Sequence, residues 1–516
     1  MTNPNDNMAA AVAAHQRGQL EAAERLYLRV IKQAPNYAPA MCYLGIVLVQ
    51  QGKAAAALKP LAAAIRALPS SVEAHAHYGL ALAMSGDNTL ALPHFDRALQ
   101  LDPRNANVLQ NRGNALKLLR RFDEAIESFD RAIALSPRNP ELHNNLGTVL
   151  AETGRFAEAV ASYDRTLAID PSHADAHENR GNALSWLGRH EDALQAYRRA
   201  LSLRPDSADL HYALAYAHLR HGDYREGFKE YEWRLRQPEN ISRRADYRRP
   251  LWLGTPLLDG KSILLASEQG LGDTLQFARY VPLVAAMGAR VVLRVQSPLR
   301  ELLAALPGVA TMIDRDENIP PTDYYCPLPS LPLAFATEIA TIPSPGAYIA
   351  APAGRIEPWR ERIPQARRRI GIAWRGNPKH RDDRLRSMTL ARIAPLLQTP
   401  GAAFVSLNPG IPPEEAAALA TMPSVTNLAP DLRDFADTAA VLASLDLVIA
   451  VDTAIAHLAG AMGRPVWIMI ASSNDWRWLN GREDSPWYPT ARLFRQPAFG
   501  DWASVIARVG RELQGF

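Results

Sequence analysis

Six prolines divide the first 205 residues of the chain into segments of equal length. They stand 34 residues apart, at Pro35, Pro69, Pro103, Pro137, Pro171 and Pro205. A fixed period of this length is typical of stacked helix–turn–helix units, because each unit is too small to bury its own apolar face and relies on its neighbours. The spacing therefore predicts an α-solenoid in the first half of the chain, a fold whose surfaces serve in binding.

Other residue types keep the same period. Small residues recur where we expect helices, at Gly45, Gly79, Gly113, Gly147 and Gly181 and at Ala23, Ala57, Ala91, Ala125, Ala159 and Ala193. Bulky residues follow four positions after the alanines, at Tyr27, Leu61, Phe95, Phe129, Tyr163 and Tyr197. Small residues opposite large ones allow paired helices to interlock. A second set of glycines marks the turn inside each unit, at Gly52, Gly86, Gly154, Gly188 and Gly222.

This order of glycine, alanine, aromatic and proline positions resembles the tetratricopeptide repeat. We count about seven units over residues 4–241, of which the first is degenerate and the last lacks its proline. The resemblance implies that a protein or peptide partner binds in the solenoid groove.

Two sets of polar residues share the period and lie on the first helix of each unit. Amide side chains at Asn111, Asn145 and Asn179 could hold an extended peptide backbone, although asparagine is also common at this position of the repeat. Histidines stand at His75, His143, His177 and His211. Stacked repeats lie about 10 Å apart, too far for shared metal ligands. We interpret the histidines as packing residues between helices, with a pH-sensitive groove as the alternative.

Composition narrows the class of protein. Hydrophobic residues make up 47% of the 516 residues, enough for several cores. Only Cys42 and Cys326 are present, so we expect no disulfide framework and a reducing compartment. The first residues lack the features of a signal peptide, and no run of about 20 apolar residues occurs. We therefore expect a cytoplasmic protein without a transmembrane segment, and the small net charge of +4 gives no reason to expect a nucleic-acid partner.

The repeat pattern ends after Tyr231. The following basic stretch, Arg234 to Arg249, is interpreted as a connector, with a nucleic-acid or membrane patch as the alternative. From Lys261 onward, strands and helices alternate, which predicts parallel sheets. The expected strands lie at 261–268, 289–295, 310–314 and 323–328, and then at 369–374, 402–407, 447–452 and 465–470. Ligands of such sheets bind at the carboxyl ends of the strands.

The segment from Leu447 to Met469 carries the strongest local signal. A buried strand ends at Asp452, Thr453 opens a helix, and His457 follows one turn later. The backbone N–H groups at this helix start, together with the Thr453 hydroxyl, form a potential phosphate seat. A generic turn between strand and helix would have the same appearance.

The residues from Asp452 to Val466, DTAIAHLAGAMGRPV, resemble the sugar-nucleotide site of the heptosyltransferase-like glycosyltransferases. The loop from Glu268 to Thr274, EQGLGDT, resembles the loop of that family that carries its catalytic carboxylate. The resemblance implies the GT-B fold, with two Rossmann-like domains after the repeats. The architecture is also similar to that of protein O-GlcNAc transferases and of repeat-containing flagellin glycosyltransferases. We expect the fold class α + α/β, with a solenoid at 1–241, a linker at 242–260, and Rossmann-like halves at 261–350 and 351–516.

The resemblance assigns Asp273 as the general base that deprotonates the acceptor hydroxyl, with Glu268 as the rival. Asp273 could instead serve as a cap of the helix that follows it. Arg386 and Ser387 match the region that binds the donor phosphate, with Lys379 and His380 as alternatives, while the charges from Arg381 to Arg386 could also form a solvated loop. The remaining residues expected in the donor site are Gly270, Gly272, Thr274, Trp374, Gly376, Asn377, Ser406, Asn408, Asp452, Thr453, Ala454 and His457.

Trp476, Arg477 and Trp478 form a possible loop for the sugar or the acceptor, with core packing as the alternative. No His/Cys pairing is visible, so we expect a metal-independent reaction without a cofactor. The leading hypothesis is an inverting glycosyltransferase that moves a sugar from a nucleotide-sugar donor to Ser or Thr of a protein bound by the repeats. The alternatives are transfer to a saccharide or lipid, with the repeats as a partner dock, and a non-catalytic repeat scaffold with a nucleotide-binding domain.

Overall fold

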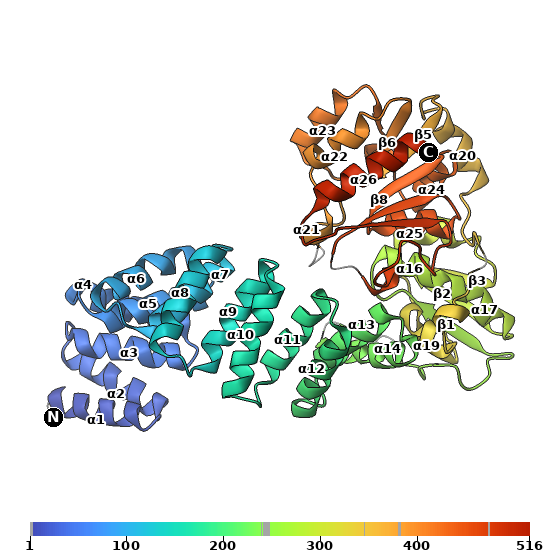
Figure 1. Ribbon diagram of the computed structural model, residues 1–516. Coiled ribbons are helices and arrows are strands. Elements are labelled where there is room, and N and C mark those ends of the chain that lie inside the picture. The colour runs from blue at the N-terminus through green and yellow to red at the C-terminus, as the bar shows by residue number, and fades with distance from the viewer. Residues whose placement is uncertain (1–3, 239, 241–247, 345, 380–382, 473–474) are drawn as a thin grey trace. The chain divides into compact units, whose positions relative to one another are not determined.

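The computed structural model describes residues 4–238, 240, 248–344, 346–379, 383–472 and 475–516 (Figure 1). The chain divides into two compact units, Met1–Arg204 and Pro205–Phe516.

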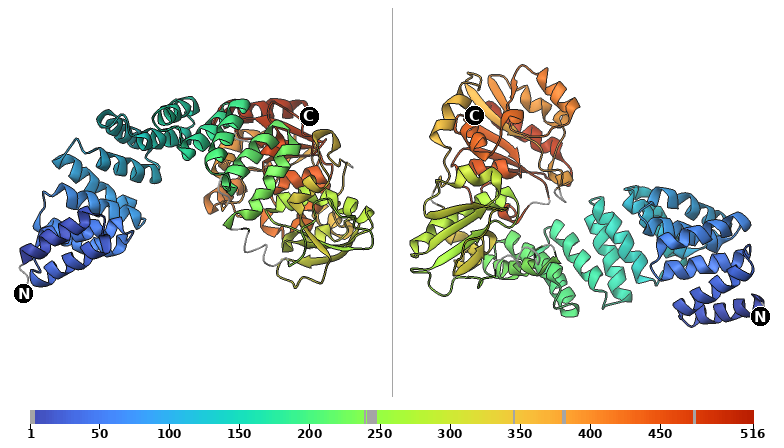
Figure 2. Two further views of the ribbon diagram at one scale, coloured as in Figure 1. Left: turned by 90° about the horizontal axis from the view of Figure 1, so that it is seen from below. Right: turned by 180° about the vertical axis from the view of Figure 1, so that it is seen from behind.

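The first unit consists of stacked helix pairs, as the period predicts (Figure 2). Its helices are α1 (Pro4–Gln16), α2 (Leu20–Gln33), α3 (Ala38–Gln50), α4 (Ala54–Ala67), α5 (Val72–Met84), α6 (Asn88–Leu101), α7 (Ala106–Leu118), α8 (Phe122–Leu135), α9 (Pro140–Glu152), α10 (Phe156–Ile169), α11 (Ala174–Trp186) and α12 (His190–Leu203). The seventh pair, α13 (Ala208–His221) and α14 (Tyr224–Tyr231), lies in the second unit.

The mid-helix glycines allow close packing inside each pair. A Cβ atom on Gly147 would lie 2.6 Å from Cε1 of Tyr163, and Gly45, Gly79, Gly113 and Gly181 are equally close to the bulky residues sixteen positions later. Such distances leave no room for any side chain, which confirms that the small and large positions interlock. The five predicted turn glycines all adopt the left-handed conformation, with φ between 71° and 92°. In the fourth helix pair Arg120 occupies this turn with φ 60°.

The histidines of the repeats bind the ends of the preceding helix pairs. Nε2 of His75, His143, His177 and His211 lies 2.9 to 3.1 Å from the carbonyl oxygen of the repeat proline six positions earlier. Two residues after these same prolines, the side chains of Ser71, Asn139, His173 and Ser207 cap the next helix. The histidines therefore bind proline carbonyls as well as packing between helices, and this contact was not predicted.

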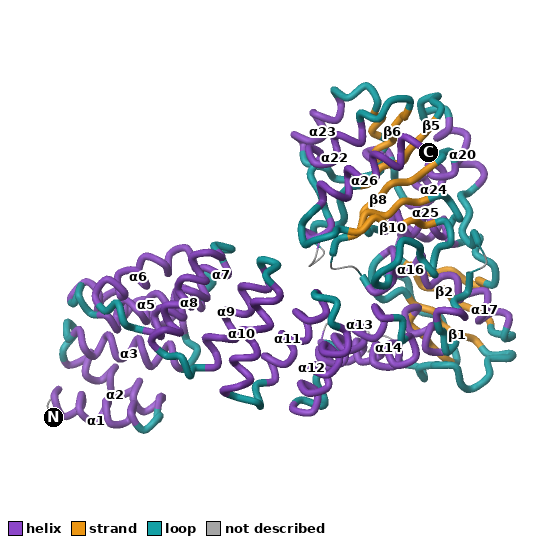
Figure 3. The backbone as a smooth tube through the Cα atoms, viewed as in Figure 1, coloured by secondary structure: helices purple, strands orange, loops and turns teal. Residues whose placement is uncertain are grey.

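The second unit contains two parallel sheets that follow the helix pair α13–α14 and the short helix η1 (Glu232–Arg236) (Figure 3). The first sheet has the order β3-β2-β1-β4, from β1 (Ser262–Ala266), β2 (Arg290–Val295), β3 (Val309–Asp314) and β4 (Tyr324–Pro327). Its helices are α16 (Leu271–Phe277), α17 (Val281–Ala286), α18 (Arg300–Leu303) and α19 (Leu331–Ala334), with short helices η2 (Ala278–Tyr280), η3 (Ser297–Leu299), η4 (Leu328–Ser330) and η5 (Ile339–Thr341). The helix expected from Thr274 to Met287 is interrupted at η2, because Pro282 has no N–H to continue it.

The second sheet has the order β10-β9-β8-β5-β6-β7, and every pair in it is parallel. Its strands are β5 (Arg368–Ala373), β6 (Ala402–Ser406), β7 (Val425–Asn427), β8 (Leu447–Val451), β9 (Val466–Ile470) and β10 (Ala491–Arg495). Its helices are α20 (Ala353–Arg360), α21 (Asp383–Arg386), α22 (Leu390–Leu397), α23 (Pro413–Ala420), α24 (Phe435–Ala443), α25 (Ala454–Ala461) and α26 (Trp502–Gly515), with η6 (Ala429–Asp431) and η7 (Trp476–Trp478). The expected strands are present, while β7 and β10 were not predicted.

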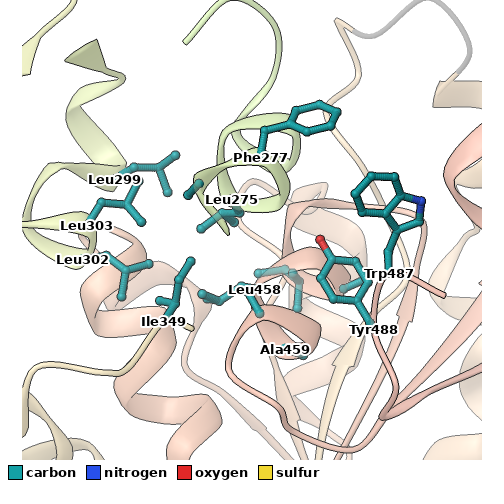
Figure 4. Packing of buried hydrophobic residues seen from close by; sticks show 14 of the residues in the cluster. Leu275, Phe277, Leu299, Leu302, Leu303, Ile349, Leu458, Ala459, Trp487 and Tyr488 are labelled. Atoms are coloured by element: carbon teal, nitrogen blue, oxygen red, sulfur yellow. The ribbon is translucent and has the colours of Figure 1, made fainter. Parts of the chain in front are cut away.

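Alternate residues of the central strand β8 pack against different helices. Leu447, Ile449 and Val451 share a core with α22 and α26, whereas Val448 and Ala450 share one with α24 and α25. The second of these cores extends to the first sheet. Figure 4 shows Leu275 of α16 near Leu458 of α25, and both belong to one cluster that also includes Tyr224, Phe228 and Tyr231 of the last repeat. The two sheets and the last repeat therefore share one hydrophobic core.

Part of the predicted linker, residues 242–247, lies outside the described residues, including Arg243 and Arg244 of the basic stretch. The remainder is packed: Leu251 pairs with Tyr325 in a β-bridge, and Trp252 is buried. Arg234, expected in a connector, is fully buried. The connector is therefore packed against the fold at these residues.

Candidate active site

The glycine-rich loop after β1 begins α16 and presents Asp273 in its first turn. The Gly270 N–H donates to Oδ2 of Asp273 at 2.7 Å, so the carboxylate does cap this helix. Its other oxygen, Oδ1, accepts from the Arg477 guanidinium of η7. Burial raises the pKa of Asp273, and the charge of Arg477 opposes that rise. About a fifth of the side chain remains exposed, which leaves the carboxylate accessible to a ligand.

The turn after β8 lies opposite this loop. Thr453 is extended, at φ −146° and ψ 171°, and its Oγ1 is buried with no hydrogen-bond partner among the described residues. The Asp452 carbonyl accepts from Nη1 of Arg386 at 2.7 Å. Burial, reinforced by the charge of Asp475, raises the pKa of the Asp452 carboxyl to about 6. This helix start thus combines free donors with a nearby guanidinium, as an anion site requires.

His457 joins the two loops. A Cβ atom on Gly272 would lie 2.7 Å from Cδ2 of His457, so the glycine-rich loop touches the first turns of α25. Nδ1 of His457 lies 2.9 Å from the Tyr488 hydroxyl, and its ring stacks on Trp478 at 5.3 Å. Burial and the charge of Arg477 lower the pKa of His457 to about 3, so the imidazole is neutral near pH 7.

A third loop, after β5, joins the same region through Arg386. The Gly376 N–H donates to Oγ of Ser387 at 2.8 Å, and Ser387 donates to Asp383 at 2.8 Å. A Cβ atom on Gly376 would lie 2.3 Å from Oδ1 of Asp383, so only glycine fits there. Asn377 and Lys379 are exposed on this loop. His380, Arg381 and Asp382 lie outside the described residues.

A cavity of about 720 Å³ opens beside this loop. It is lined by Arg375, Pro378, Asp383, Arg384, Ser387, Met388, Thr389 and Arg392. Its three guanidinium groups favour a negatively charged ligand.

Several residues expected in the donor site are buried next to the loops that form it. Trp374, Thr274, Ser406 and Asn408 are buried. Asn408 accepts from the Trp374 N–H at 2.6 Å and donates to the Arg375 carbonyl at 2.7 Å, so it supports the loop from behind. These four side chains expose almost no surface, and their part in the donor pocket stays a prediction.

The aromatic residues of η7 are also core residues. Trp476 and Trp478 are fully buried. Trp476 packs against Tyr224, Phe228 and Tyr231 of the last repeat, so neither of its faces is free for a sugar. Between them, Arg477 donates to Asp273, Asp475 and Gln276. The packing alternative therefore describes the two tryptophans, and Arg477 is the member of the loop that reaches the site.

Glu268, the rival base, is held by an arginine. Nε and Nη2 of Arg234 each lie 3.0 Å from one oxygen of its carboxylate. Arg234, Asp383 and the buried Arg279, which donates to the carbonyls of Pro343 and Trp487, were not predicted. Arg234 gives no local signal of burial, since its partners Glu268 and Ser330 are far away in the sequence.

Among the described residues, no group of three or more His, Cys, Asp or Glu side chains is arranged to hold a metal ion. In the same part of the chain, no helix is both long enough and apolar enough to cross a membrane.

Helix pairs with a 34-residue period, followed by two parallel sheets whose loops converge on one site, define a repeat protein with an α/β domain of the GT-B kind. Tetratricopeptide-repeat profiles match residues 42–106 and 111–174, 94–127, and 186–222. The profile of glycosyltransferase family 9 (heptosyltransferase) matches residues 404–495. The chain therefore carries tetratricopeptide repeats and a family 9 domain, which supports a glycosyltransferase.

The chain is similar to the protein FlbA of Caulobacter vibrioides, with 30% identity over 318 residues. The match covers 56% of this chain and 52% of FlbA, so the chain spans about half the length of this relative. Among solved structures, it is similar to YrrB, a repeat protein described as having an unusual peptide-binding site, at 23% identity and a TM-score of 0.33 over 36% of this chain and 96% of YrrB. It is also similar to PilF of Pseudomonas aeruginosa, at 23% identity and a TM-score of 0.36 over 40% and 97% of the two chains.

Proposed function

We propose that this protein transfers a sugar from a nucleotide-sugar donor to a Ser or Thr hydroxyl of a protein bound by its repeats. The contact between the Asp273 loop and the α25 helix start, at Gly272 and His457, is the observation that carries this proposal. It brings a partly exposed carboxylate close to a cluster of donors suited to phosphate.

Asp273 acts as the general base in this proposal. It takes the proton of the acceptor hydroxyl while the hydroxyl oxygen forms a bond to the anomeric carbon of the sugar. The bond from that carbon to the donor phosphate breaks on the opposite face, so the configuration inverts. Its raised pKa suits this task, because a base works best when its pKa approaches the working pH.

The departing nucleotide phosphate is stabilised by fixed donors. Arg386, the N–H groups at the start of α25 and the Thr453 hydroxyl lie on one side of the site. The arginine-lined cavity beside the β5 loop provides room for the rest of the nucleotide. Preorganised donors of this kind stabilise developing negative charge, a role that a divalent cation has in other enzymes. We therefore expect transfer to continue in the presence of EDTA.

The decisive experiment compares Asp273→Asn with Asp316→Asn, which changes an exposed carboxylate in the turn after β3. Donor hydrolysis and transfer should fall about 10²–10⁴-fold in the first variant and stay unchanged in the second, while nucleotide binding is retained in both. Full turnover in Asp273→Asn would remove Asp273 as the base.

The protein acceptor rests on the repeats. Asn111, Asn145 and Asn179 are half-buried on α7, α9 and α11, and Nδ2 of Asn179 donates to Asn144 at 3.2 Å. Replacing the three asparagines with alanine should weaken modification of a protein acceptor but spare donor hydrolysis. The control replaces Glu127 and Gln195, which are exposed on the second helices α8 and α12. Unchanged modification of the protein acceptor in the triple variant would show that these asparagines do not select it.

A further inference from the structure

Arg234 is a fully buried guanidinium with all its hydrogen-bond donors in use. Nε and one Nη2 hydrogen bind Glu268, and the other Nη2 hydrogen binds Ser330 at 2.6 Å. Nη1 donates to Glu232 at 2.6 Å and to the Tyr231 carbonyl at 3.1 Å. These contacts satisfy the five N–H groups of an arginine. A buried ion pair this complete is costly to break from one side, typically by 3–5 kcal/mol.

The partners of Arg234 belong to different parts of the fold. Arg234 and Glu232 lie in η1, directly after the last repeat helix α14. Glu268 follows β1 and is the first residue of the loop that leads to Asp273, while Ser330 lies in η4 after β4. Ser330 also donates to Glu232 at 3.0 Å, which closes the network. The end of the repeats is thereby fixed to the beginning of the candidate catalytic loop.

A second contact from the same repeat holds the next residue of that loop. The Tyr231 hydroxyl lies 3.0 Å from Oε1 and 2.8 Å from Nε2 of Gln269. On the other side, the Gln269 carbonyl accepts from Gln296 and from Arg315, both at 3.1 Å. The Gly270 N–H then binds Asp273 itself. Three consecutive residues therefore connect the last repeat to the carboxylate.

We infer that Arg234, assisted by Tyr231, is a positioning residue that sets the place of Asp273 through Glu268 and Gln269. This inference rests on the proposed role of Asp273 as the base. It makes Glu268 a link between the repeats and the loop, not a second base. The last repeat is then a working part of the transferase as well as the end of the solenoid.

The test uses the full chain and four variants. Arg234→Lys keeps one charge but loses the two-point contact, Glu268→Gln removes the charge on the other side, and Tyr231→Phe removes only the phenol. Arg236→Lys is the matched control, because Arg236 is exposed in the same short helix. Each protein is measured for kcat and KM with the nucleotide-sugar donor, and for hydrogen exchange of the amides from Gly270 to Phe277.

The first three variants should lower kcat about 10–100-fold with donor KM within about threefold of wild type, because a small displacement of a reacting group has effects of this size. Arg234→Lys combined with Glu268→Gln should be no worse than the more impaired single variant, since both act through one contact. Amides of the loop should exchange at least about tenfold faster in these variants and at the wild-type rate in Arg236→Lys.

Hydrogen exchange separates this inference from the proposed function. Faster exchange of the loop supports positioning by the repeat even if no sugar transfer is found with any donor. If the Arg234 and Glu268 variants fail to fold, Tyr231→Phe decides, because it leaves the ion pair intact. Wild-type kcat and wild-type loop exchange in the folded variants would overturn the inference, as would independent, additive effects of Arg234→Lys and Glu268→Gln.

Discussion

Gly272 and His457 are in contact across the candidate active site: a Cβ atom on Gly272 would lie 2.7 Å from Cδ2 of His457. The imidazole cannot yield easily, since it lies against Trp478 and bonds to Tyr488. We therefore expect Gly272→Ala to separate the two loops, lowering the unfolding free energy by about 1–3 kcal/mol and turnover at least about tenfold.

Gly354→Ala is the control for that variant, because a methyl group there meets no neighbouring atom. Thermal unfolding and donor hydrolysis measure the two effects. Wild-type turnover in Gly272→Ala would show that the loops need not touch.

Asp437 of α24 should be the main residue whose protonation weakens the packing of α24 against α20. It accepts from Nη1 of Arg355 at 2.6 Å, from Nε1 of Trp359 at 3.0 Å and from Arg433. Burial works against its ionisation, yet the hydrogen bonds from Arg433, Trp359 and Arg355 lower its pKa to about 2. Because this pKa lies below that of the unfolded chain, the stabilisation is fully present above about pH 4 and is lost as the pH falls toward 2.

Asp437→Asn should therefore lower the unfolding free energy near pH 7 by about 3–5 kcal/mol, and the difference from wild type should shrink below pH 4. Chemical unfolding across this pH range is the measurement. Asp431→Asn, which changes an exposed carboxylate, should have little effect. If Asp437→Asn lowered the free energy of unfolding equally at every pH, the ionised carboxylate would not be the source of the stabilisation.

The effect of Asp452 on the free energy of unfolding should depend on pH in the opposite direction to that of Asp437. Its folded carboxyl keeps its proton up to about pH 6, whereas the unfolded one releases it near pH 4. Between these values the unfolding free energy falls as the pH rises, by up to about 3 kcal/mol. Asp452→Asn should thus melt higher than wild type at pH 7.5 and at the same temperature at pH 4. A melting temperature below that of wild type at pH 7.5 would show that the charge stabilises the fold.

Arg120 occupies a turn at which the six other helix pairs have glycine. Its φ of 60° costs a residue with a side chain about 1 kcal/mol, whereas glycine adopts it freely. Arg120→Gly should therefore stabilise the repeats by about 0.5–1 kcal/mol, less any contribution from its contact with the Phe122 ring at 5.1 Å. Gly188→Ala, at the equivalent turn with φ 71°, should destabilise them by a similar amount. Unfolding in denaturant should show a higher free energy of unfolding for Arg120→Gly and a lower one for Gly188→Ala. Changes in the same direction would contradict this prediction.

The repeats and the central strands could be predicted because their signals are local. The 34-residue period located the close pairs such as Gly147 and Tyr163, and runs of apolar residues located β1, β5 and β8. Strand β7 was missed because it has only three residues, all half-buried, and so leaves no apolar pattern.

The candidate site could be predicted only in part. Asp273, Asp452, Thr453 and His457 lie in loops of recognisable sequence, and the structure does bring these loops together. Burial of Trp374 and Trp476 could not be foreseen, because tryptophan fits either a core or a ligand site. Arg234 was hidden for a different reason: its partners Glu268 and Ser330 are 34 and 96 residues away, so no local pattern distinguishes it from the exposed arginines that follow.

Membership of the pair α13–α14 in the compact unit Pro205–Phe516 has a consequence for how such chains can evolve. Whole repeats upstream of Pro205 can be gained or lost by recombination in steps of one period, since each contacts mainly its neighbours. The seventh pair cannot be exchanged in this way, because its residues are bonded to Glu268 and Gln269. Under the proposed function, the range of acceptors can therefore diversify through the number and surface of the upstream repeats, while the α/β part is inherited as one block that includes its own terminal repeat.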